Sequence, residues 1–182
     1  MSTATRLPIF GATSLGLLLL AIAGCATPAA EPSLRYDRSL DVPGVTIVLD
    51  ASPREIASGD STSLTLAFSN TSDRDVVMSF PERRQVGLLV YELDGPGVEL
   101  DDPGDVPGTP LPIDVNTIAV PRRLHLRPFE TWTYEVPWDG TLDLGHRHMP
   151  LDPGHYALVV GARRSGDDYV NRSRPIALEV TR

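Results

Sequence analysis

The stretch SLTLAFSN, residues 63–70, alternates polar and apolar side chains with a period of two. One face would carry Leu64, Leu66 and Phe68, and the other Ser63, Thr65 and Ser69. Successive side chains of a β-strand point to opposite faces of its sheet. The stretch therefore predicts a strand with one buried and one exposed face.

The same period recurs along the rest of the chain. Residues 45–50, 75–80, 131–136, 155–162 and 175–180 each place apolar side chains at every second position. Residues 86–93 are apolar on both faces instead, which predicts a central strand covered on both sides. No segment has convincing helical periodicity.

Turn-forming residues separate these runs, as at Asn70-Thr71-Ser72, Asp94-Gly95 and Ser165-Gly166-Asp167. Asn70 and Asn171 each begin an N-glycosylation pattern, and we interpret both as turn residues only. Short strands with frequent turns predict an all-β fold, an antiparallel sandwich of about seven to eight strands. Cys25 is the only cysteine, so the sandwich has no disulfide.

The segment DPGHYAL, residues 152–158, sharpens the fold prediction. Asp152, Gly154 and Tyr156 have the spacing of a tyrosine corner, in which the Tyr hydroxyl bonds back to nearby backbone. This motif resembles immunoglobulin-like domains, although Leu158 stands where many of them have a cysteine. We expect a disulfide-free immunoglobulin-like sandwich with Trp132 in its core.

Four segments taken in order resemble the BsuPI family of intracellular proteinase inhibitor domains. They are LAFSNTSDRDVVMSFP (66–81), VYELDG (90–95), LHLRPFETWTYEVPWDG (124–140) and LDPGHYAL (151–158). Where the family has Pro-Gly-Glu, this chain has Pro128-Phe129-Glu130. The resemblance covers roughly residues 45–162 and implies an immunoglobulin-like domain that binds a protein, as a proteinase inhibitor or an adaptor.

The first 24 residues have the pattern of a bacterial export signal. Arg6 precedes an apolar run that ends in the small residues Ala23 and Gly24, directly before Cys25. Ile22-Ala23-Gly24-Cys25 resembles the lipobox of lipoproteins, in which the cysteine thiol receives a diacylglycerol and the new amino terminus an acyl chain such as palmitate. The alternative is a plain signal peptide with an incidental cysteine.

These features predict three parts: signal peptide 1–24, lipidated Cys25 with a flexible tether to residue 41, and a sandwich over 42–182. The partners expected are a membrane, through lipid on Cys25, and an unidentified protein. The exported protein would be anchored to the cell membrane or the outer membrane. The formal net charge of −8 argues against binding of nucleic acid, which needs a basic surface.

We predict that the chain is not an enzyme and needs no cofactor. It lacks a Gly-x-Ser-x-Gly elbow, a His-Glu-x-x-His pair and a phosphate-binding glycine loop. The alternative function is copper or zinc binding by His146, His148 and His155, with Met149 nearby. His125, in an alternating segment, is expected to face solvent.

An acidic segment rich in proline and glycine, residues 95–112, follows the central strand. It is long for a sandwich connection, and long loops are often functional, so it is the best candidate for contacting a partner. It could equally be a dispensable insertion. A calcium site is a further alternative, with the carboxylates of Glu99, Asp101, Asp102 and Asp105.

Overall fold

The computed structural model describes residues 41–80, 86–111, 116–118, 120–143, 147–165 and 168–182. These residues form strands and no helix, which confirms the predicted all-β class. No described segment is a helix that could span a membrane. The export signal, Cys25 and the tether up to residue 40 lie outside the described residues and stay predictions.

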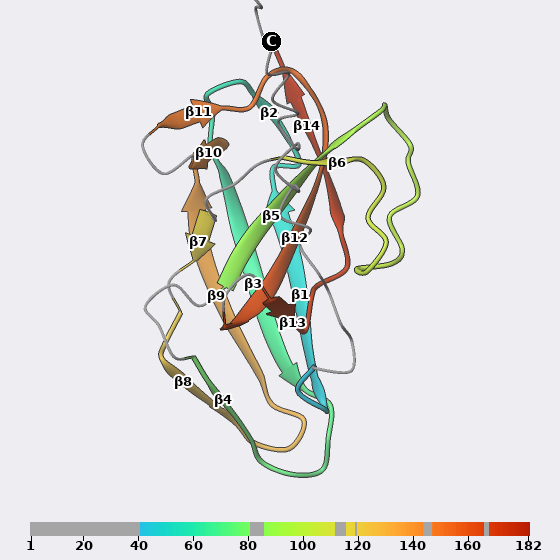
Figure 1. Ribbon diagram of the computed structural model, residues 1–182. Helices are drawn as coiled ribbons and strands as arrows, with labels where there is room; N and C mark the ends of the chain where they lie inside the picture. Colours follow the sequence, from blue (N-terminus) through green and yellow to red (C-terminus); the bar gives the residue numbers. More distant parts are fainter. Residues whose placement is uncertain (1–40, 81–85, 112–115, 119, 144–146, 166–167) are drawn as a thin grey trace, which may run out of the picture. The chain divides into compact units, whose positions relative to one another are not determined.

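Two sheets enclose the main core (Figure 1). The three-stranded sheet is antiparallel in the order β1 (Val45–Ser52), β3 (Thr62–Asn70), β9 (Thr131–Trp138). The seven-stranded sheet has the order β2 (Glu55–Ala57), β14 (Ile176–Thr181), β12 (Gly154–Ser165), β5 (Val86–Leu93), β6 (Thr109–Pro110). In addition, β7 (Asn116–Ile118) pairs with β5, and β13 (Asp168–Val170) pairs with β12.

Two small two-stranded sheets are also present. They are β4 (Val76–Ser79) with β8 (Arg123–Leu126), and β10 (Thr141–Asp143) with β11 (His148–Pro150). The chain changes sheets after β1, because β2 pairs in parallel with β14. Every run predicted from alternation is a strand, whereas β2, β6 and β10, strands of two or three residues, were not predicted.

The buried positions follow the predicted alternation. Leu64, Leu66 and Phe68 of β3 are at most 1% exposed and face Leu158 and Val160 of β12 across the core. Burial of this apolar surface between the two sheets is the main stabilising term of such a fold.

The outer face of β5 and β12 holds a second apolar cluster. It consists of Leu89, Tyr91, Leu93, Ala157 and Val159. Residues 94–108, here called the covering loop, place Val98, Leu100 and Val106 against this cluster. This confirms the prediction that residues 86–93 form a central strand, and it gives the acidic segment a structural role.

The prediction for Trp132 is only partly right. Trp132 faces inward but is half-buried, stacked on Tyr134 with ring centroids 5.6 Å apart. It lies on β9, an edge strand, so packing covers it incompletely. The buried tryptophan is Trp138, 8% exposed, whose Nε1–H donates to the carbonyl oxygen of Thr141 at 3.1 Å.

Candidate functional site: the edge of strand β1

The tyrosine corner forms as the sequence predicted. The hydroxyl of Tyr156, a residue 3% exposed, donates a 2.7 Å hydrogen bond to the carbonyl oxygen of Asp152. Burial raises the pKa of Tyr156, and the negative charges of Glu92 and Asp152 raise it further. This bond fixes the entry into β12 and so the position of β14 beside it.

A groove of about 600 Å³ runs along β1. One wall is β1 itself, residues 45–49. The other is formed by residues 171, 172 and 174–176, which lead into β14, together with Leu100 and Asp101 of the covering loop. Asp41, the first described residue, also lines it.

The hydrogen-bond pattern shows which peptide groups of β1 face this groove. The N–H of Thr71 donates to the carbonyl oxygen of Gly44 at 2.7 Å, and Val45 pairs with Asn70. Bonded and non-bonded pairs alternate along an antiparallel ladder. Backbone groups therefore point away from β3 at Val45, Ile47, Leu49 and Ala51.

Both ends of this outward row are capped. At the amino-terminal end of β1, Asn171 Nδ2 donates to the carbonyl oxygen of Val45 at 3.0 Å, and the N–H of Val45 donates to the carbonyl oxygen of Val42. At the carboxyl-terminal end of β1, the N–H of Ala51 donates to Asp50 Oδ1 at 2.9 Å. The hydrogen bonds from Arg54 and Ala51 lower the pKa of Asp50, so this cap is ionised at neutral pH.

The middle of the edge is open. Within the described part of the chain, the outward N–H and C=O groups of Ile47 and Leu49 have no hydrogen-bond partner. Ile47 and Leu49 as whole residues, backbone included, are only 5% and 3% exposed, so the strand is firmly seated in the core and its unbonded peptide groups border the groove with little contact with solvent. Between them Val48, 56% exposed, stands on the outer face of the sheet.

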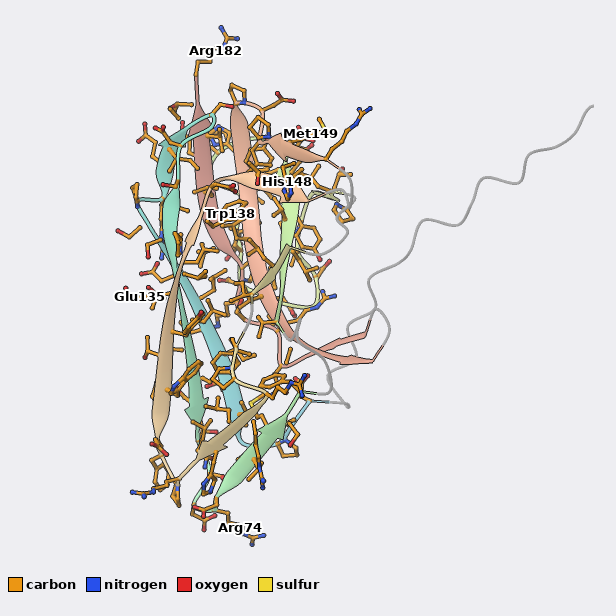
Figure 2. The ribbon with its side chains drawn as sticks, turned by 90° about the vertical axis from the view of Figure 1, so that its left-hand side faces the viewer. Arg74, Glu135, Trp138, His148, Met149 and Arg182 are labelled. Atoms are coloured by element: carbon orange, nitrogen blue, oxygen red, sulfur yellow. The ribbon has the colours of Figure 1, made fainter. Side chains whose placement is uncertain are left out.

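The opposite edge of the same sheet is protected. Asn70 N–H donates to the carbonyl oxygen of Glu130, so the outward row of β9 falls on residues 131, 133, 135 and 137. Pro137 has no N–H, and Glu135 adds a charge, two features that discourage strand addition (Figure 2). The open stretch of β1, residues 46–49, has neither a proline nor a charged side chain.

Two buried asparagines lie near the start of β1, and the sequence assigned them only to turns. Asn171, 4% exposed, accepts from the N–H of Val42 and donates to the carbonyl oxygens of Val42 and Val45. Asn70, 2% exposed, donates to the carbonyl oxygens of Arg74 and Arg127. No sequence signal marks these contacts, since Asn171 lies 126 positions from Val45.

The other predicted residues do not assemble into a site. His148 lies on β11 near the end that carries Arg182 (Figure 2), His155 lies on β12, and His146 is outside the described residues. No three His, Cys, Asp or Glu side chains in the described ranges are placed to hold a metal ion. The four acidic residues considered for calcium are likewise not grouped around a metal site, and all are exposed: Glu99, Asp101, Asp102 and Asp105. His125 is exposed, as predicted, with Nε2 3.3 Å from Asp75.

No family model matches the chain, and neither does any curated protein. Among solved structures, a β-glucosidase from Erythrobacter marinus has 13% identity and a TM-score of 0.43, over 75% of this chain and 15% of its own. An alkylpurine DNA glycosylase from Pseudomonas fluorescens has 12% identity and a TM-score of 0.40, over 75% and 30%. The CARDB domain of a Pyrococcus furiosus protein has 12% identity and a TM-score of 0.38, over 75% and 91%. Such distant likenesses carry no functional argument.

Proposed function

We propose that this chain is an exported lipoprotein, held on a membrane by acyl chains on Cys25, whose sandwich binds another protein along the edge of β1. The anchor rests on the lipobox-like Ile22-Ala23-Gly24-Cys25. The binding role rests on one observation, the open peptide groups of Ile47 and Leu49 beside a groove.

The chemistry of that edge favours an extended partner segment. Peptides that add a strand to a sheet edge gain affinity from main-chain hydrogen bonds and specificity from side-chain pockets. Here the caps at Val45 and Ala51 limit the row, so only a short strand of a partner can pair. Proteinase inhibition, which the BsuPI resemblance implies, is one form of this function; an adaptor is the other.

The anchor is tested by growing cells that express the full chain with labelled palmitate. The label is expected on the protein and lost in Cys25→Ala. A native chain without label would contradict the anchor and leave the binding proposal to its own test.

The binding site is tested by a photo-crosslinking amino acid placed at Val48 in the full chain in its native cells. The control position is Thr133, which lies level with Val48 on the same face because both pair with Ala67. A crosslinked partner is expected from position 48 and not from 133.

A backbone variant separates strand addition from other contacts. Ile47→Pro removes an outward N–H but no bond to β3, whereas Ile47→Val keeps that N–H. We expect crosslinking from position 48 to disappear in Ile47→Pro and to persist in Ile47→Val. Thermal unfolding is the control that shows both variants to be folded. Equal crosslinking in the two would overturn strand addition. Assaying the captured partner for protease activity then distinguishes inhibitor from adaptor.

A further inference from the structure

The turn between β8 and β9 exposes an aromatic side chain on an unusual backbone. The N–H of Glu130 donates to the carbonyl oxygen of Arg127 at 3.1 Å, which makes Pro128 and Phe129 the two central residues. Phe129 has φ of 58° and is 72% exposed. Turns with positive φ at this position favour glycine, and a bulky residue there is a genuine outlier.

This turn is rigidly held. Glu130 Oε2 accepts from the N–H of Arg127 at 2.7 Å, and Asn70 Nδ2 donates to the carbonyl oxygen of Arg127 at 2.9 Å. The same amide of Asn70 donates to the carbonyl oxygen of Arg74 at 2.6 Å, joining this turn to the turn after β3. Phe129 is therefore presented on a fixed support. Strained residues so held are candidates for function.

The polypeptide enters the domain at this same end. The bond from Thr71 N–H to Gly44 ties the start of β1 to the turn after β3, and Figure 2 places Arg74 of that turn at the end opposite Arg182. Only residues 26–40 separate Cys25 from Asp41, a length that spans at most about 50 Å. Acyl chains on Cys25 would keep this end near the bilayer.

We propose that Phe129 inserts into the interfacial region of the membrane that holds the protein and so fixes the orientation of the domain. This inference rests on the lipid anchor of the proposed function. The charges beside Phe129 balance, since Arg74 and Arg127 are matched by Asp73 and Glu130. The contact is therefore apolar rather than electrostatic, and it needs no anionic lipid.

A bilayer suits this tip better than a protein partner does. Specific protein interfaces bury more than about 1,000 Å² around an apolar centre. The neighbours of Phe129 in the turn, Arg127 and Glu130, are exposed and charged. A single aromatic side chain ringed by balanced charge matches the membrane interface, where aromatic and charged groups coexist.

The test uses the full mature chain in nanodiscs of phosphatidylcholine, a lipid without net charge, so that electrostatic attraction does not contribute. A nitroxide label is attached at Asp73→Cys, whose native side chain is 84% exposed, so that Phe129 stays intact. A label at Val48→Cys is the control away from this end. Collisions with oxygen, which partitions into lipid, are compared with collisions with an aqueous nickel complex.

We expect the label at position 73 to show a higher ratio of oxygen to nickel collisions than the label at 48. Phe129→Gly should bring the two ratios together. Equal ratios in the chain with Phe129 would overturn the proposal, as would a difference that survives in Phe129→Gly. A fall in both kinds of collision at position 73 would indicate protein contact between copies and would also overturn it.

Failure of the anchor itself is visible in the same sample. An acylated Cys25 thiol cannot take a label, so an anchored chain carries one nitroxide. Two nitroxides per chain would show that the lipid anchor is wrong. One nitroxide with equal ratios would show that the anchor holds and that the Phe129 contact is wrong.

Discussion

The side-chain amide of Asn171 donates a 3.0 Å hydrogen bond to the carbonyl oxygen of Val45, across 126 positions of the chain. This bond occupies the outward carbonyl group at the amino-terminal end of β1 and joins the two walls of the groove. Asn171 has φ of 47°, a left-handed conformation that asparagine tolerates better than most residues. One side chain thus sets both the backbone turn and the limit of the open edge.

Asn171→Ala should lower the free energy of unfolding by about 3 kcal/mol, because it leaves buried groups of Val42 and Val45 without partners. Urea unfolding of the soluble domain measures the loss. Asn171→Gly is the matched control, because glycine accepts the positive φ without steric cost but, like alanine, lacks the side-chain amide. If the glycine variant were as stable as the native chain, the hydrogen bonds would not matter.

Tyr156→Phe should cost about 1 kcal/mol through loss of the bond to Asp152. Tyr91→Phe is the control, because Tyr91 is 7% exposed and its hydroxyl has no partner among the described residues. A Tyr156→Phe variant of native stability would mean that the corner does not contribute to folding.

The pKa of Tyr156 also predicts a dependence on pH. Its folded pKa lies above the ordinary value of 10.0, so the unfolded chain loses this proton first as the pH rises. The stabilisation is complete below pH 10 and is lost progressively above it. Unfolding at pH 9 to 11 should show this decline in the native chain and a smaller one in Tyr156→Phe. Parallel declines would assign the effect to other groups.

Phe129→Gly should raise the free energy of unfolding by about 1 kcal/mol, because glycine adopts a positive φ without the steric cost of a Cβ. Thermal unfolding is the measurement. Phe129→Ala keeps the Cβ and should give no such gain. Equal stability of the glycine and native chains would mean that the turn is not strained.

Replacing Val98, Leu100 and Val106 together by serine should uncover the outer face of β5 and β12. We expect a loss of about 3 kcal/mol and new binding of a hydrophobic dye. Changing the exposed Glu99 and Asp101 to Gln and Asn should leave stability within about 0.5 kcal/mol. A stable triple variant that binds no dye would make the covering loop dispensable after all.

Much of the fold could be predicted because alternation is a local signal. Residues 63–70 or 176–181 show their inward face without reference to any neighbour. The corner at Tyr156 was also predictable, since its partner Asp152 is four positions away. One further signal was available: apolar Val98, Leu100 and Val106 in an acidic loop match the apolar outer face of residues 86–93.

The candidate site was not predictable in the same way. Whether Ile47 and Leu49 bond to a neighbour depends on β1 lying at the edge of its sheet, which follows from the order of the strands. Trp132 is only half-buried for the same reason, because β9 forms the other edge of the three-stranded sheet.

The most direct test of strand addition at β1 is residue-resolved amide hydrogen exchange by NMR on the free protein. The amides of Thr46, Val48 and Asp50 bond to β3 and should exchange slowly, whereas those of Ile47 and Leu49 face the groove and should exchange much faster. Slow exchange at all five amides would contradict the open edge, since another segment or a second copy would then already occupy it.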